Sequence, residues 1–139
     1  MKKIVKEVPG YELHDEAKAP GWHHSKTGWR SDAARCGPLI FCGAIGCHPV
    51  THELGETPEE QVRLIFQHFE GAFGVHGATL QDIVHMTLYF TDREAHWPIF
   101  DKVRREIYPV DPPVTVGVGT HGLAVGAVIE IDALAAAPD

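Results

Sequence analysis

The stretch TPEEQVRLIFQHFEGAFGVHGATLQDIVHMTLYFT, residues 57 to 91, decides the fold because a helical pattern is followed directly by a strand pattern. In the first half, apolar side chains recur at helical spacing on one stripe, at Val62, Ile65, Phe66, Phe69 and Phe73. In the second half, apolar and polar side chains alternate, with Val84, Met86, Leu88 and Phe90 on one face and His85, Thr87, Tyr89 and Thr91 on the other. A helix and a strand that each have one apolar side are expected to pack against each other.

Local signals mark both ends of this helix. Thr57, followed by Glu60 three residues later, has the pattern of a capping box, and Pro58 suits the first helical position. Gly74 and Gly77 are expected to end the helix.

Upstream of this stretch the sequence predicts a β-hairpin. In RSDAARCGPLIFCGAIG, residues 30 to 46, two extended runs meet at Cys36, Gly37 and Pro38, which are typical turn residues.

Downstream, a second helix and two further strands are expected. DREAHWPIFDKVRREIYP, residues 92 to 109, has helical spacing through Trp97, Phe100, Val103 and Ile107, with Pro98 near its beginning and Pro109 at its end. VTVGVGT (114–120) and AVIEIDALA (127–135) are β-rich runs separated by the turn HGLAVG (121–126).

The resulting order predicts an α+β domain in which two helices cover one face of a mixed sheet. LIFCGAI (39–45) and AVIEIDALAA (127–136) are apolar on both sides, so the uncovered face is expected to be buried by a partner subunit. An oligomer follows as a hypothesis.

Length and composition favour one soluble domain. We expect residues 1–27 to form an N-terminal arm of loop with at most a short strand, and residues 28–139 to form a single domain. The net charge of −7, without a cluster of Lys and Arg, argues against a nucleic-acid partner. No stretch has the pattern of a signal peptide or a membrane span, so a cytoplasmic protein without a membrane partner is expected. Cys36, Cys42 and Cys47 match no zinc pattern and are interpreted as reduced thiols, with Cys42 acting as a small apolar residue.

Two carboxylates interrupt the last apolar strand. Glu130 and Asp132 are two residues apart and therefore project to the same side of that strand. That side faces either bulk water or a site enclosed at a subunit boundary, and the pattern alone leaves both open. Asp132 is interpreted as structural or solvent-facing.

Four segments, in this order, resemble the Rid/YjgF family, also called the L-PSP or translation-initiation-inhibitor family, over residues 28 to 136. They are LIFCGAIGCHPVTHELGETPEEQ, GATLQDIVHMTLYFTD, FDKVRREIYP and the closing strands from PPVTVGVG to VIEIDALA. The resemblance implies a chorismate-mutase-like α+β fold that assembles as a homotrimer, with a small-molecule pocket in each cleft between subunits. It also implies hydrolysis of reactive imines or enamines to a carbonyl compound and ammonia, with no cofactor and no metal.

The resemblance also implies the site residues. Glu130 matches the family glutamate that holds the attacking water and is the expected catalytic residue. Trp29 stands where the family has a tyrosine, Asp101 where it often has an asparagine, and Val116 where many members have a cysteine. The remaining expected substrate-binding residues are Arg30, Gly43, Ala44, Val114, Thr115 and His121.

The chain departs from the family at Val114, where the imine deaminases have an arginine that binds the substrate carboxylate. Either Arg30, Arg104 or Arg105 replaces that arginine, or the substrate lacks the carboxylate; we prefer the second interpretation. The expected function is a hydrolase or deaminase acting on an imine, enamine or related unsaturated nitrogen compound other than the usual 2-iminoacid. The alternative is a non-catalytic trimer that binds a small ligand. A ribonuclease is disfavoured by the acidic charge.

The ten histidines do not form a recognisable metal motif. His23 and His24 are adjacent in the sequence. His48 and His52 are four residues apart, but they flank Pro49 in an expected turn, so neither pair lies on a helix as the two histidines of a zinc protease do. His24 and His121 are the two expected nearest a cleft, where a neutral imidazole can take part in acid–base chemistry.

Overall fold

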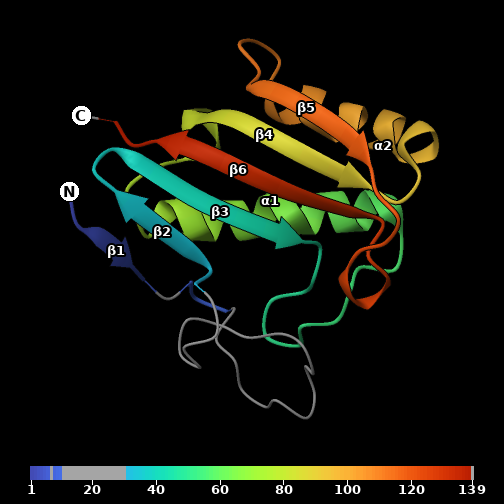
Figure 1. The fold of residues 1–139 in the computed structure, drawn as a ribbon, viewed down its shortest axis with the longest axis horizontal. Coiled ribbons are helices and arrows are strands. Elements are labelled where there is room, and N and C mark those ends of the chain that lie inside the picture. The colour runs from blue at the N-terminus through green and yellow to red at the C-terminus, as the bar shows by residue number, and fades with distance from the viewer. Residues whose placement is uncertain (7, 11–30, 139) are drawn as a thin grey trace.

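A computed structural model describes residues 1–6, 8–10 and 31–138, which form a six-stranded mixed sheet with two helices on one face (Figure 1). The strand order is β1-β2-β3-β6-β4-β5; β4 and β5 are parallel and the other neighbours are antiparallel. The strands are β1 (Lys3–Val5), β2 (Ala33–Cys36), β3 (Leu39–Ile45), β4 (Ile83–Phe90), β5 (Val114–Gly119) and β6 (Ile129–Ala136), and the helices are α1 (Pro58–Gly74) and α2 (Arg93–Ile107). The predicted α+β class and element order are confirmed. The short strand allowed for the N-terminal arm is β1, at the sheet edge.

The predicted hairpin is formed by β2 and β3. Cys36 pairs with Leu39 across a two-residue turn of Gly37 and Pro38. Gly37 has φ +58°, in the left-handed region where a residue without a Cβ is favoured. The hairpin places β3 beside β6, the strand that carries Glu130.

Helix α1 begins and ends where the sequence indicates, with one difference at its start. The Thr57 hydroxyl accepts from the Glu60 N–H at 3.1 Å, as predicted. The Glu60 carboxylate, however, accepts from the N–H of Glu56 at 2.7 Å and not from that of Thr57, so the capping box is shifted by one residue. The predicted apolar stripe is fully buried against the sheet.

Strand β4 confirms the predicted alternation except at its first two residues, Ile83 and Val84. Met86, Leu88 and Phe90 are buried, but Val84 is exposed and Ile83 is buried in its place. A register shift between Ile83 and His85 in the pairing with β6 accounts for this, because an extra residue in one strand reverses the side-chain direction before it. The prediction for Val84 is therefore wrong.

Helix α2 begins after Asp92, whose carboxylate accepts from the Ala95 N–H at 3.1 Å. Phe100 and Val103 are buried, whereas Trp97 and Ile107 are half-buried at the edge of the core. Aromatic rings join the two helices: Phe66 of α1 stacks on Phe100 with ring centroids 6.3 Å apart. The helices therefore form one continuous layer over one side of the sheet.

No helix among the described residues covers the other side of the sheet. We call it the open face; its described residues are Lys3, Val5, Ala34, Cys36, Leu39, Phe41, Gly43, Ile45, His85, Thr87, Tyr89, Val114, Val116, Val118, Glu130, Asp132, Leu134 and Ala136. Its apolar members include Phe41, whose exposed fraction is 47%, and Val114, at 65%. The expected bare, partly apolar face is present in the single chain.

The cysteines and the membrane prediction can also be compared with the structure. Cys36, Cys42 and Cys47 are not joined in disulfides, and Cys42 is buried in the core as expected of a small apolar residue. Within residues 1–6, 8–10 and 31–138, neither α1 nor α2 has the length and apolar character needed to span a membrane.

Candidate functional site

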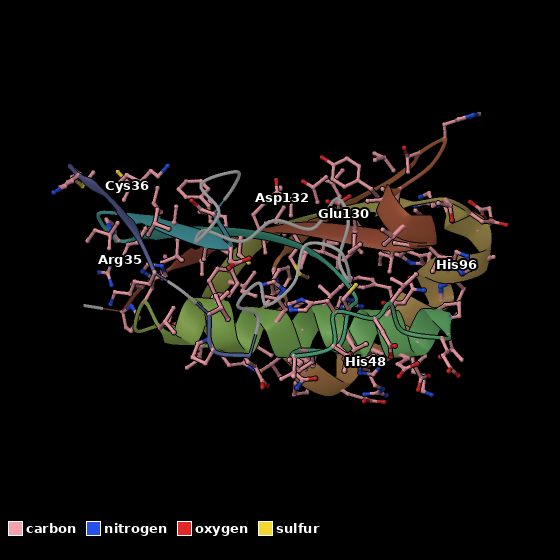
Figure 2. The ribbon with its side chains drawn as sticks, turned by 90° about the horizontal axis from the view of Figure 1, so that it is seen from below. Arg35, Cys36, His48, His96, Glu130 and Asp132 are labelled. Atoms are coloured by element: carbon pink, nitrogen blue, oxygen red, sulfur yellow. The ribbon has the colours of Figure 1, made fainter. Side chains whose placement is uncertain are left out.

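The two carboxylates of β6 lie on the open face. Figure 2 shows Glu130 and Asp132 on the side of β6 that points away from α1. Ile129, Ile131 and Ala133 point the other way and are buried under the helices. The predicted common direction of the two acidic side chains is confirmed.

Glu130 sits in a row of four residues across the sheet. It pairs with Ile45 of β3 on one side and with Tyr89 of β4 on the other, and Tyr89 pairs in turn with Val118 of β5. Ile45 is buried and Tyr89 is half-buried. Directly opposed residues of neighbouring strands have Cβ atoms about 4.5–5.5 Å apart, so the carboxylate lies between an apolar side chain and a phenol.

Asp132 occupies the next row, with Gly43 on one side and Thr87 and then Val116 on the other. A Cβ at Gly43 would meet no atom closer than the Ile131 carbonyl oxygen at 3.8 Å, and the Asp132 carboxylate is 4.0 Å away. Gly43 is therefore exposed, with the Asp132 carboxylate beside it.

Val114 lies one row further along the open face, directly across from His85. His85 is half-buried and pairs on its other side with Leu134. The position that would hold a carboxylate-binding arginine thus carries an exposed isopropyl group beside an imidazole.

Two expected site residues face the helices. Ala44 pairs with the buried Ile131 and is itself buried on the helix side of β3. Thr115 pairs with the buried Met86, and its hydroxyl donates to the Pro113 carbonyl at 3.0 Å. The structure does not bring either side chain together with Glu130, because neighbouring residues of a strand point to opposite faces.

Asp101 and the two arginines beside it lie on α2, on the far side of the sheet from Glu130. The Asp101 carboxylate accepts from Arg104 Nε at 3.0 Å and from Arg105 Nε at 2.8 Å. Arg104, and then Arg105, hold the pKa of this carboxyl below its usual value. Within the chain, both arginines therefore serve Asp101 and not the open face.

The remaining expected residues fall outside the site or outside the described residues. Trp29, Arg30, His23 and His24 are in the part of the chain that the structure does not describe. His121 is exposed in the loop between β5 and β6. His48 forms an ion pair with Glu60, with Nε2 and Oε1 3.0 Å apart (His48 is labelled in Figure 2).

A cavity and the arrangement of possible metal ligands can be compared with the position of Glu130. A cavity of about 550 Å³ is lined by Glu70, Gly74, Ala78, Thr79, Leu80, Gln81 and Ile107, all on the helix side of the molecule. Among residues 1–6, 8–10 and 31–138, no three His, Cys, Asp or Glu side chains gather as a metal site would require.

Sequence reasoning missed one neighbour of Glu130 and one residue that contacts the start of its strand. Tyr89 is assigned to the same face as His85 by its alternation, but only the pairing of β4 with β6 places it next to Glu130. Gln61 of α1 is buried and accepts a hydrogen bond from Val128, two residues before Glu130; a polar side chain among the apolar positions of α1 was the available signal.

Comparisons with known proteins agree on one family. The family model described as Endoribonuclease L-PSP matches residues 25–137. The RutC family protein YjgH of Escherichia coli is 35% identical over 115 residues, which cover 78% of this chain and 83% of that protein. A RutC family protein of Aquifex aeolicus is 31% identical over 100 residues, covering 71% of this chain and 80% of that protein. The solved structure of a "probable translation initiation inhibitor" from Rhodopseudomonas palustris has a TM-score of 0.83 at 25% identity and covers 99% of this chain and 100% of that one.

Proposed function

The chain belongs to the endoribonuclease L-PSP family, also called the Rid/YjgF family, whose members are known broadly as imine and enamine deaminases, and from this premise we propose that it hydrolyses a small imine or enamine. The observation that carries the proposal is the placement of Glu130, a carboxylate on the open face between Ile45 and Tyr89. A carboxylate flanked by an apolar group and a phenol is suited to hold one water molecule as a base.

The proposed reaction needs only water and a base. Glu130 accepts a proton as the water oxygen bonds to the carbon of the C=N group, and the π electrons move to nitrogen. That proton is then delivered to nitrogen, which gives a carbinolamine. In a second transfer the hydroxyl proton passes, through Glu130, to the same nitrogen as the oxygen lone pair forms the C=O bond and the C–N bond breaks, so the products are a carbonyl compound and ammonia. An enamine enters the same route after tautomerising to its imine. No cofactor or metal takes part in this scheme.

We further propose that the site is completed in a homotrimer, where the open face of one chain meets a neighbouring chain. Support comes from the exposed apolar residues of that face, among them Phe41, Val114 and Val116. A soluble monomer rarely exposes a contiguous apolar patch of this kind without a partner. Enclosure by a second chain would also exclude bulk water from Glu130, which strengthens electrostatic interactions there.

The substrate is proposed to lack the carboxylate of the usual 2-iminoacids. Val114 offers no hydrogen bond, and Arg104 and Arg105 are paired with Asp101. A hydrogen bond to a charged group contributes roughly 1.5–3 kcal/mol, so a carboxylate-bearing substrate would bind about tenfold to a few hundredfold more weakly here. The acidic charge of the chain acts in the same direction and disfavours nucleic-acid partners.

Ammonia release from a panel of uncharged and carboxylate-bearing imines and enamines tests this proposal, with Glu130→Gln and Asp132→Asn compared with the parent chain. Glu130→Gln should lower turnover by about 10²–10⁴-fold, the range for loss of a general base. Asp132→Asn, two residues along the same strand, is the matched control and should retain most activity. Unchanged turnover in Glu130→Gln would remove this residue from the mechanism. Ligand-induced thermal stabilisation without any ammonia release would instead favour the non-catalytic binding trimer.

A further inference from the structure

Gln61 is a buried amide in the first turns of α1, with an exposed fraction of only 4%. Its Nε2 donates to the Gly55 carbonyl at 2.9 Å, and its Oε1 accepts from the Val128 N–H at 3.0 Å. The side chain therefore connects the loop before α1 to the segment that enters β6, across 67 residues of sequence.

The backbone around Gln61 is packed so tightly that the amide has little freedom. A Cβ at Gly46 would lie 2.1 Å from the Gln61 carbonyl oxygen, so only glycine fits where β3 passes this turn of the helix. The same loops bury a second small apolar cluster, formed by Ile45, Cys47 and Ala127 with Leu54 and Leu123 packed against it. Ile45 of this cluster is the residue that pairs with Glu130.

Both backbone polar groups of Val128, its N–H and its carbonyl, are hydrogen-bonded. Its N–H is held by Gln61, and its carbonyl accepts from the Thr91 N–H at 3.1 Å. Two residues later comes Glu130, so the direction in which β6 leaves Val128 sets the position of the carboxylate on the open face. The Thr91 hydroxyl also donates to this carbonyl, at 3.5 Å, whereas the Val128 N–H is held by the Gln61 side chain.

We propose that Gln61 is a positioning residue for Glu130: by holding the Val128 N–H, it fixes the start of β6 and thereby the carboxylate that activates water. The inference rests on the proposed function, and it adds a role on the helix side of the sheet to a site on the open face. A displacement of about 1 Å remote from the reacting atoms can cost about 10²-fold in rate.

The test compares Gln61→Met, which fills the space without either hydrogen bond, with Tyr108→Phe. Tyr108 is the matched control, because its buried hydroxyl donates to the Leu80 carbonyl at 2.6 Å at the other end of the helix layer. With the best substrate of the panel, Gln61→Met should lower kcat about tenfold to a hundredfold with KM changed less than threefold. Tyr108→Phe should stay within about twofold of the parent in both constants, although it too loses stability. Equal losses in the two variants would overturn the proposal.

Two further arms keep the outcome decisive. Gln61→Glu keeps an acceptor for the Val128 N–H, and its protonated carboxyl can also donate to the Gly55 carbonyl, so it should recover part of the lost kcat; recovery no better than in Gln61→Met would count against the proposal. If Gln61→Met does not fold, Gln61→Asn, which is one methylene too short to reach both partners, takes its place.

A spectroscopic readout separates failure of this inference from failure of the proposed function. If the parent chain releases no ammonia from any substrate, the proposed function fails. The backbone amide resonance of Val128 and the side-chain carboxyl ¹³C resonance of Glu130 then decide about Gln61. Both should shift in Gln61→Met and stay in place in Tyr108→Phe. Unmoved resonances in Gln61→Met would overturn the positioning role.

Discussion

At the scale of single residues, the side chain at position 114, a valine, distinguishes the open face. The side chain is exposed and lies across from His85, so a longer residue there would reach over the same surface as Glu130 and Asp132. A guanidinium is the group whose planar pair of N–H donors matches a carboxylate. Substrate charge is therefore expected to be decided by this one position.

Val114→Arg should shift the substrate preference of the enzyme toward imines that carry a carboxylate. The ratio of kcat/KM for a carboxylate-bearing imine to that for its uncharged analogue should rise about tenfold to a few hundredfold. Val110→Arg, at an exposed position before β5 and outside the open face, adds the same charge and should change the ratio far less. Equal changes in the two variants would show that net charge, and not a specific clamp, governs the preference.

His76 is a second residue with a measurable consequence. It is buried, with an exposed fraction of 3%, and its carbonyl accepts from Arg35. Burial, followed by the positive charges of Lys6 and Arg35, lowers the pKa of this imidazole below its ordinary 6.5. The unfolded chain therefore binds a proton at a pH where the folded chain does not.

The stability contributed by a neutral His76 is present above pH 6.5 and is lost as the pH falls from 6.5 through the lower pKa of the folded chain. His76→Leu should flatten that part of the curve when the free energy of unfolding is measured by urea denaturation from pH 7.5 to 5. His121→Leu, at an exposed position, serves as the control. A slope in His76→Leu as steep as that of the parent would assign the pH dependence to other groups.

At the scale of elements, the contact between α2 and β5 depends on the absence of a side chain. The Trp97 ring lies over Gly117, where a Cβ would come within 2.8 Å of Cζ3 and 3.3 Å of the Phe90 ring. Arg93 covers the same indole, with its guanidinium carbon 5.3 Å from the ring centroid. The Trp97 ring is therefore confined between α2 and the edge strand β5, with little room to move away from residue 117.

Gly117→Ala should destabilise the fold by about 1–3 kcal/mol, the usual cost of overpacking a filled site. Gly119→Ala in the same strand is the matched control, because its Cβ would meet no atom within 4 Å. That substitution should be neutral or slightly stabilising, since alanine restricts the unfolded chain more than glycine does. Urea denaturation of both variants checks the difference, and equal stabilities would show that Trp97 can move aside.

At the scale of the whole molecule, the sheet has one face packed under helices and one face open. The open face combines exposed apolar residues with Glu130 and Asp132, which suits an enclosed interface better than a surface in water. Association through this face would cover the apolar residues and complete the candidate site in one step.

Sedimentation velocity should therefore show a trimer that persists at low micromolar concentration. Val116→Asp places a charge on the open face, on the edge strand β5, and should dissociate the trimer, because burying an unpaired charge is costly. Gln67→Asp adds the same charge on an exposed position of α1 and should leave the trimer intact. A parent chain that sediments only as a monomer would contradict the proposed assembly and, with it, the enclosed site.

The order and faces of the elements could be predicted because they depend on local periodicity. The stripe from Val62 to Phe73, the turn at Gly37 and the alternation around Glu130 each follow from spacing along the chain. The family resemblance, too, is carried by short segments in a fixed order. Val84 shows the limit, because a bulge depends on how two distant strands register and leaves no mark in the alternation itself.

What the sequence alone determined was therefore which side of β6 carries the carboxylates, since side-chain direction is fixed by the backbone of that strand. Only the tertiary structure decided what surrounds them: Tyr89 and Ile45 beside Glu130, His85 beside Val114, and Gln61 holding Val128. Likewise, only the structure showed that Thr115 and Ala44 face the helices. The physical reason is that neighbours across a sheet are set by strand order and register, which arise from the packing of the whole chain and not from any local segment.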